Sequence, residues 1–390
     1  MTLRQLFLRH QGQTSPNPAG IEIERAEGIY MYGTDGKRYT DLIAGVSVSS
    51  VGHCHPAVVK AVAEQAGKYM HLMVYGEFVQ APQALFAGRI ASLLPDSLSS
   101  VFFVNSGSEA NEGAVKLARR YTGRTEIIAC AGAYHGSTLG SLSLMSDEYF
   151  KTPFRPLLPE VRYIGFNDFD ALSAVSSRTA CVVAEAVQGE AGVRLPAEGY
   201  LQALRDRCRE TGALLIFDEV QTGFGRLGAM FASERYGVVP DIMTVAKGMG
   251  GGMPVGAFIS SKEIMDSLQS NPALGHITTF GGHPVSCAAG LAALDVLLSE
   301  KLIDGVERKG AMFRNLLKDA AVEEIRGEGL LIAVELGTPE RLSKFIENAY
   351  RNGIVTDWFL FNNTSFRISP PLIVSESQIE ETCETLKKQL

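Results

Sequence analysis

The stretch ALLIFDEVQTGFGRLGAMFASERYGVVPDIMTVAKGMGGG, residues 213–252, contains two short apolar runs separated by a polar segment with several glycines. Similar runs recur between about residues 50 and 290 and alternate with amphipathic stretches. They are VFFV, TEIIAC, RYIGF, TACVVAEAV, ALLIFDEV and DIMTVAK. Buried parallel strands that alternate with helices produce this pattern. We therefore predict an α/β fold with a mostly parallel central sheet.

The two ends of the chain show a different pattern. The first 45 residues include a predicted hairpin with a turn at Thr34-Asp35-Gly36. Residues 291–390 mix helical stretches, the first a continuous one from LAALDVLL to NLLKDA, with strand-like runs, which suits an α+β domain. A chain of 390 residues is longer than one hydrophobic core usually supports. We predict a large domain over residues 46–290 and a small domain formed by 1–45 together with 291–390, with the hairpin packed against the C-terminal part.

Composition narrows the functional class. The net charge of -7 and the absence of a block of basic residues argue against nucleic-acid binding. The N-terminal segment has no sustained apolar stretch of the kind found in signal peptides or membrane anchors. The six cysteines lack paired spacing, as expected for reduced thiols. We predict a cytoplasmic protein that acts on small molecules and contacts neither nucleic acid nor membrane.

One short cluster, His53-Cys54-His55, contains residue types that bind metals. Ligands this close in sequence need a second pair elsewhere to surround one ion, and no such pair stands out. We interpret the cluster as a turn before the helix AVVKAVAEQ and predict no metal site.

The residues that follow the apolar runs carry the chemistry, because ligands of open α/β sheets bind at the carboxyl ends of the strands. After VFFV comes the small polar loop Asn105–Asn111, whose backbone N–H groups and hydroxyls could bind a phosphate at a helix start. The same residue types are also ordinary helix caps. Tyr134 and His135 could present an aromatic face to a planar ligand, or pack in the core.

Two further strand ends carry charged residues. Asp218 follows so apolar a run that its carboxylate needs a cationic partner. That partner is either a nearby arginine such as Arg226 or the protonated nitrogen of a pyridine ring, which would make the ring an electron sink. Lys247 follows the next run and precedes a glycine-rich segment, which would let a flat ring approach or would simply be a flexible loop. Burial lowers the pKa of a lysine and makes its amine nucleophilic.

A phosphate cradle, an acid for a pyridinium, an aromatic face and a lysine at a strand end together fit one cofactor, pyridoxal 5'-phosphate. A nicotinamide cofactor fits less well, because no G-x-G-x-x-G motif follows the first strand.

Seven stretches resemble the class III aminotransferases, the group of ornithine, acetylornithine, putrescine and 4-aminobutyrate aminotransferases. In the order of the family they are GHCHPAVVKAV, FFVNSGSEANEGAVKLARR, EAVQGEAGV, LLIFDEVQTGFGRLG, PDIMTVAKGMGGGMPVGA, TTFGGHPVSCAAG and RISPPLIV. The resemblance covers almost the whole chain. It implies the fold of the aspartate aminotransferase type, fold type I of the pyridoxal phosphate-dependent transferases, in which the large domain binds the cofactor.

The resemblance also implies roles for individual residues. Lys247 would hold the cofactor as a Schiff base and move the proton, and Asp218 would contact the pyridine nitrogen. The other residues that it places around the ring and the phosphate are Ser106, Gly107, Ser108, Tyr134, His135, Glu185, Val220 and Gln221. Thr279 would reach the phosphate of the other subunit's cofactor, which implies a homodimer with shared active sites.

Substrate binding is implied for Glu190 and Arg367. They resemble the pair in which glutamate masks the arginine for an amino donor and releases it for the carboxylate of 2-oxoglutarate or glutamate, although a purely structural ion pair is the alternative. Ser137 departs from the family, because ornithine and acetylornithine aminotransferases usually carry an arginine there for the α-carboxylate of the substrate. The departure favours a donor without that carboxylate, such as putrescine, or a carboxylate held by another residue.

The prediction is a transaminase of amino acid metabolism. It would move a terminal amino group from an ornithine-, acetylornithine- or putrescine-like donor to 2-oxoglutarate, giving an aldehyde and glutamate. The alternatives are an aminotransferase for 4-aminobutyrate or another omega-amino acid, and an aminomutase or decarboxylase of the same fold. A regulatory protein that binds the cofactor without catalysis is a further alternative, which the presence of Lys247 and Asp218 disfavours.

Overall fold

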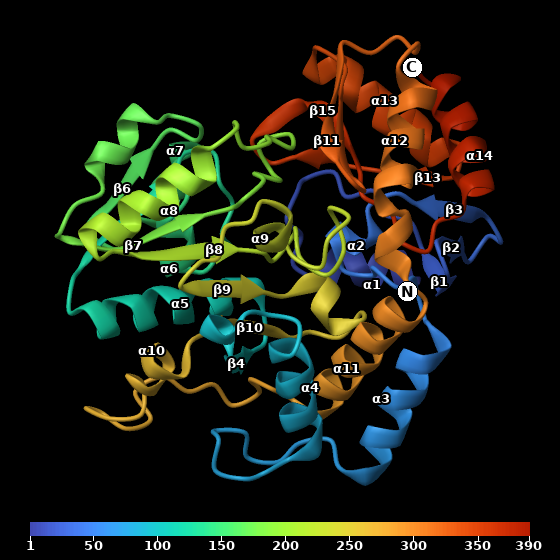
Figure 1. Ribbon diagram of the computed structural model, residues 1–390. Coiled ribbons are helices and arrows are strands. Elements are labelled where there is room, and N and C mark those ends of the chain that lie inside the picture. Colours follow the sequence, from blue (N-terminus) through green and yellow to red (C-terminus); the bar gives the residue numbers. More distant parts are fainter.

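The computed structural model describes all of residues 1–390, and the six apolar runs form strands of one central sheet (Figure 1). This sheet has seven strands in the order β4-β10-β9-β8-β7-β5-β6. The strands are β4 (Ser100–Val104), β5 (Glu126–Cys130), β6 (Val161–Ile164), β7 (Thr179–Ala184), β8 (Leu214–Asp218), β9 (Ile242–Val245) and β10 (Gly256–Ser260). The predicted α/β fold is confirmed.

Strand β10 is the antiparallel member of this sheet. It pairs antiparallel with both β4 and β9, whereas β9, β8, β7, β5 and β6 pair in parallel. The link from β9 to β10 is too short for the crossover that a parallel pair requires, so the chain returns in the opposite direction. The sheet is therefore mostly parallel, as predicted.

Both faces of the sheet are covered by helices, because successive strand residues point to opposite faces. Ile216 packs in a cluster with the apolar residues of α5 (Gly107–Thr122). Its neighbours Leu215 and Phe217 pack in a cluster with those of α8 (Tyr200–Thr211). A third cluster joins β9 and β10 to α11 (Pro284–Ser299), which also lies against α3 (Pro56–Lys68) and α4 (Ala81–Ala91).

Two smaller sheets are built from the ends of the chain, drawn blue and red in Figure 1. The first has the order β1-β2-β3-β13, with β1 (Ile23–Glu27), β2 (Tyr30–Gly33), β3 (Arg38–Asp41) and β13 (Ile354–Val355). The second has the order β11-β12-β15-β14, with β11 (Glu324–Glu328), β12 (Leu331–Glu335), β14 (Trp358–Phe359) and β15 (Asn362–Ile368). Because β13 pairs in parallel with β3, the predicted N-terminal hairpin does pack with the C-terminal part. The division into domains 46–290 and 1–45 with 291–390 stays a prediction.

The predicted continuous helix from residue 291 to 320 is wrong. Helix α11 ends at Ser299, and Lys301 has a φ of 52°, a left-handed conformation that interrupts the helix. The chain continues as the 3-10 turn η5 (Leu302–Gly305) and α12 (Val306–Leu317). Strand β11, which follows, was not predicted.

The remaining helices complete the two ends and the loops. They are α1 (Leu3–His10), α2 (Ala44–Ser47), α6 (Leu139–Ser143), α7 (Glu148–Lys151), α9 (Ala232–Arg235), α10 (Lys262–Asp266), α13 (Pro339–Arg351) and α14 (Glu376–Lys387), with the 3-10 turns η1 (Asp96–Leu98), η2 (Thr152–Phe154), η3 (Asp170–Ala174) and η4 (Lys247–Gly250). No helix combines the length and the apolar character needed to cross a bilayer. In the His53-Cys54-His55 cluster, His53 contacts Asp41 and His55 caps α3 by accepting the N–H of Ala57.

Candidate active site

A cavity of about 390 Å³ lies at the carboxyl ends of the central strands. Its wall brings together residues that follow β4, β5, β7, β8 and β9, which are far apart in the sequence but meet at one edge of the sheet. The predicted cofactor residues in this wall are Ser106, Gly107, Ser108, Tyr134, His135, Glu185, Asp218, Val220, Gln221 and Lys247. Thr279 does not line the cavity of its own chain.

One end of the cavity is formed by the start of α5. Ser106 is the N-cap of this helix, and its hydroxyl accepts the N–H of Glu109 at 3.2 Å. The first N–H groups of a helix have no partner within the helix, so those of Gly107 and Ser108 are available to an anion. The loops close tightly here: a Cβ at Gly107 would lie 2.8 Å from Val220, and one at Gly136 would overlap Ser108. This end has the donors that a phosphate requires.

Asp218 is a buried carboxylate, 4% exposed, at the end of β8. It accepts a hydrogen bond from Asn111 Nδ2 at 2.8 Å and lies 2.8 Å from His135 Nδ1. The alternative ion pair with Arg226 is wrong, because Arg226 instead donates to the carbonyls of Leu330 and Pro370. No lysine or arginine therefore pairs with Asp218, and its position fits a cation supplied by a ligand, such as a pyridinium.

Asn111 was not predicted as a site residue. Its amide oxygen accepts from Thr244 Oγ1 at 2.8 Å, which orients the amide nitrogen toward Asp218. Nothing in the sequence distinguishes it from the other polar residues of the NSGSEAN loop. Only its place one turn into α5, facing the sheet, reveals the contact.

Lys247 lies two residues after the end of β9, partly exposed to the cavity. Desolvation lowers its pKa below the ordinary value, while the carboxylate of Glu190 acts in the opposite direction. Its φ of 49° is rare for a residue with a side chain. Strained backbone of this kind is concentrated at functional sites, where the surrounding structure maintains it. Burial of the amine leaves a larger neutral fraction near neutral pH than a free lysine has.

Two buried side-chain nitrogens of the wall lack partners within the chain: Gln221 Nε2 and His135 Nε2. Buried polar groups are nearly always hydrogen-bonded, so an orphaned group at a cavity indicates a missing ligand. Gln221 Nε2 fits an acceptor oxygen of such a ligand. With the anion site at one end and Asp218 at another, these residues fit pyridoxal phosphate.

Glu185 holds two loops of the cavity wall through backbone N–H groups. It accepts the N–H groups of Tyr134 at 3.1 Å and of Gly189 at 3.3 Å. Burial, together with the nearby charge of Asp218, raises its pKa well above the usual range. The Tyr134 hydroxyl lies 3.1 Å from Ser137 Oγ, so Ser137 is placed at the same edge of the site.

Glu190 and Arg367 form a buried two-pronged ion pair beside Lys247. The guanidinium donates from Nη1 to Glu190 Oε1 at 2.8 Å and from Nη2 to Oε2 at 3.0 Å. Although burial raises the pKa of Glu190, Arg367 outweighs this and lowers it below the usual value. Asp357 adds a second carboxylate, 2.9 Å from Arg367 Nε. Asp357 was missed; it lies two residues after the end of the short strand β13.

Thr279 belongs to a segment whose apolar side chains face outward. Leu274, Ile277 and Phe280 are 56%, 45% and 54% exposed. Exposed apolar residues gathered on one segment often mark an interaction surface.

The chain matches known proteins over almost its whole length. Residues 11–390 match the family model Aminotransferase class-III. The acetylornithine aminotransferase of Methanopyrus kandleri is 43% identical over 375 residues, covering 95% of this chain and 94% of that protein. The acetylornithine aminotransferase of Methanosarcina mazei is 40% identical over 378 residues, covering 94% of this chain and 91% of that protein.

Solved structures agree with this match. The ornithine aminotransferase from Toxoplasma gondii superposes with a TM-score of 0.91 at 30% identity, covering 100% of this chain and 95% of the other. A transaminase from the marine bacterium Virgibacillus superposes with a TM-score of 0.93 at 29% identity, covering 99% and 98%.

Proposed function

This chain belongs to the class III aminotransferases, and on that premise we propose that it transfers a terminal amino group from an ornithine- or acetylornithine-like donor to 2-oxoglutarate. The products would be an aldehyde and glutamate. The chain is a transaminase that depends on pyridoxal 5'-phosphate. The observation that carries the choice of acceptor is the Glu190–Arg367 pair, because a masked arginine can bind a second carboxylate that the amino donor lacks.

Pyridoxal phosphate, when bound, supplies the carbonyl that takes up the amino group and a ring that accepts an electron pair. The proposed role of Lys247 is to hold the cofactor and to carry the proton between the reacting carbons, for which its lowered pKa is suited. The carboxylate of Asp218, oriented by Asn111 and His135, would keep a proton on the ring nitrogen. Ser106, Gly107 and Ser108 would hold the phosphate.

Tyr134 and Gln221 would complete the ring site. Tyr134 would lie against the ring, and Gln221 Nε2 would donate to the phenolic oxygen. Both residues would exclude water from the reacting carbon, which would strengthen the electrostatic contacts made there.

The donor has two candidates. The relatives favour N-acetylornithine, because that substrate is in the names of the Methanopyrus and Methanosarcina proteins. Ser137 favours a putrescine-like diamine, because no arginine stands at that position to bind an α-carboxylate. A donor of either kind presents a primary amine at the end of a flexible carbon chain.

We also propose a homodimer with shared active sites. The exposed apolar side chains on either side of Thr279 support an interface at this segment. Light scattering coupled to gel filtration would test it, and a monomer that is fully active would contradict it.

A coupled assay of glutamate formation tests the function. The holoenzyme is given 2-oxoglutarate with N-acetylornithine, ornithine, lysine, putrescine, 4-aminobutyrate or β-alanine, beside a Lys247→Ala control. Transfer from N-acetylornithine or ornithine supports the first candidate, and transfer led by putrescine supports the second. If no donor yields glutamate while the cofactor is bound, the proposed function is wrong.

A further inference from the structure

We propose that Asp357 is a positioning residue that fixes Arg367, so that a dicarboxylate acceptor binds when the Glu190 side chain alone moves aside. The inference rests on the proposed function, because it concerns how the acceptor reaches the arginine. It adds Asp357 and the backbone N–H of Leu360 to the acceptor site.

The guanidinium of Arg367 is bonded along two edges. The edge formed by Nη1 and Nη2 holds the carboxylate of Glu190. The adjoining edge formed by Nε and Nη2 is held by Asp357 Oδ1, 2.9 Å from Nε, and by the carbonyl of Trp358, 3.3 Å from Nη2. The flat group also stacks over the ring of Phe359 at 4.6 Å. When Glu190 leaves, these groups still hold the guanidinium in the same plane.

The position that Glu190 occupies is a complete carboxylate site. Besides the two N–H groups of Arg367, Oε2 accepts the backbone N–H of Leu360 at 3.1 Å. A substrate carboxylate that takes the place of Glu190 would meet the same three donors. The side chain of Glu190 therefore stands in for one carboxylate of the acceptor.

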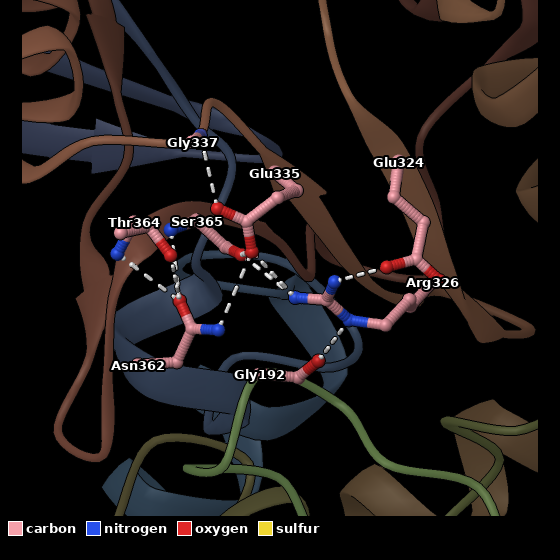
Figure 2. Close-up of polar contacts among 8 residues, drawn as sticks. All are labelled: Gly192, Glu324, Arg326, Glu335, Gly337, Asn362, Thr364 and Ser365. Atoms are coloured by element: carbon pink, nitrogen blue, oxygen red, sulfur yellow. Dashed lines mark hydrogen bonds and ion pairs between the residues drawn. The ribbon is translucent and has the colours of Figure 1, made fainter.

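The backbones on both sides of the pair are fixed, which leaves the Glu190 side chain as the part free to move. Phe361 N donates to the carbonyl of Glu190 at 3.0 Å, which ties the loop of Glu190 to the β14–β15 turn. Figure 2 shows a second tie, in which Arg326 bridges the two segments. Arg326 Nε donates to the carbonyl of Gly192 at 3.0 Å, and Nη2 donates to Ser365 Oγ at 2.8 Å and Glu335 Oε2 at 3.0 Å.

The side chain of Asn362 reinforces the turn in the same network (Figure 2). Its amide oxygen accepts the N–H groups of Thr364 at 3.2 Å and Ser365 at 2.9 Å. A Cβ at Gly192 would lie 2.8 Å from Asn362 Nδ2, so the loop and the turn are in close contact. These contacts tie the loop and the turn together, so the exchange of carboxylates is assigned to rotation of the Glu190 side chain.

The test compares wild-type holoenzyme with Asp357→Ala, Asp357→Asn and the control Asp319→Ala. Asp319 is exposed and makes no ion pair or side-chain hydrogen bond. The first readout is the affinity for glutarate, a five-carbon dicarboxylate that cannot react, measured by calorimetry. The second is the KM for 2-oxoglutarate, and the third is the rate at which the donor alone converts the cofactor, followed by absorbance.

We expect Asp357→Ala to weaken glutarate binding about tenfold and to raise the KM for 2-oxoglutarate by a similar factor, which is near the lower end for loss of one charge-assisted hydrogen bond. The donor half-reaction should keep its rate. Asp357→Asn retains an acceptor oxygen for Nε, so it should stay within about threefold of wild type. Asp319→Ala should match wild type.

Two results would overturn the inference: unchanged glutarate affinity in Asp357→Ala, or equal losses in both half-reactions. It also fails if Asp357→Asn is as poor as Asp357→Ala. If Asp357→Ala does not fold, Asp357→Ser replaces it, because a serine hydroxyl is too short to reach Nε. Wild-type enzyme that binds glutarate but forms no glutamate from any donor refutes the proposed function instead.

Discussion

Replacing Ser137 by arginine should raise activity with donors that carry an α-carboxylate, relative to activity with putrescine. Ser137 is exposed at the edge of the cavity, and its only side-chain contact is the Tyr134 hydroxyl at 3.1 Å. The backbone around it is held by Glu112, which accepts from Thr138 Oγ1 at 2.6 Å and from Gly140 N at 2.9 Å. A longer side chain at position 137 can therefore extend without moving the turn.

The size of the effect follows from the hydrogen bonds that the substitution adds and removes. An arginine that binds the donor's α-carboxylate adds hydrogen bonds to a charged group, worth about 1.5–3 kcal/mol, and exposure to water favours the lower end. Loss of the hydrogen bond to Tyr134 removes about 0.5–1 kcal/mol that does not depend on the donor. The net stabilisation of about 0.5–1 kcal/mol corresponds to a two- to fivefold rise in kcat/KM for N-acetylornithine and ornithine. Putrescine, a dication, should lose activity because the new charge repels it.

The assay is the coupled measurement of glutamate formation with the three donors, for wild type, Ser137→Arg and Ser137→Gln. The glutamine variant adds length without charge and serves as the control. The reasoning is refuted if N-acetylornithine and putrescine change by the same factor, or if Ser137→Gln reproduces the rise in activity.

Three further predictions concern the cofactor, the lysine and the pH dependence of stability. Gly136→Ala should weaken pyridoxal phosphate binding at least about tenfold, because the new Cβ overlaps Ser108 at a φ of 124°. The control Gly88→Ala, in open space on α4, should bind the cofactor normally and be more stable than wild type by about 0.5–1 kcal/mol. Cofactor titration measures the first effect and chemical unfolding the second. Lys247→Met should raise the melting temperature of the apoprotein, because the folded chain binds the lysine proton less tightly than the unfolded chain. The increase should shrink as pH rises from the lowered pKa of Lys247 toward its ordinary value. An increase that is constant with pH would contradict this account. Burial alone would raise the pKa of Glu335, but hydrogen bonds from neighbours that include Thr364 and Ser365 lower it to about 2. Glu335 therefore stabilises the fold above its unfolded pKa of about 4.3, and this contribution is lost as pH falls toward 2. In urea unfolding, Glu335→Gln should be less stable than wild type at pH 7 and less sensitive to acid between those two pKa values.

The sequence predicts the residues of the cavity well because most of them directly follow buried strands. Residues that follow buried parallel strands meet at one edge of the sheet, so Asp218 and Lys247 could be placed together from their positions after apolar runs. Tyr134 and Ser106 share this origin. The roles assigned to these residues stay predictions.

Other features depend on contacts that local patterns do not contain. Arg226 reaches the carbonyls of Leu330 and Pro370, more than a hundred residues away, so its proximity to Asp218 in sequence was misleading. The break at Lys301 lies in a segment with helical composition throughout, and only its left-handed backbone marks the end of α11. The antiparallel direction of β10 follows from the short connection between β9 and β10, whose length can be read from the sequence.

The pairing of β3 with β13 bears on how the protein is made. Thr40 lies opposite Ile354, so the first sheet cannot close until residues 354 and 355 have left the ribosome. The central sheet uses residues 100–260 and can assemble well before that. The N-terminal hairpin therefore waits as an unpaired edge during synthesis, and contacts so distant along the chain slow folding. A chain that stops before residue 354 should expose this hairpin to protease, which pulse proteolysis of stalled chains can detect.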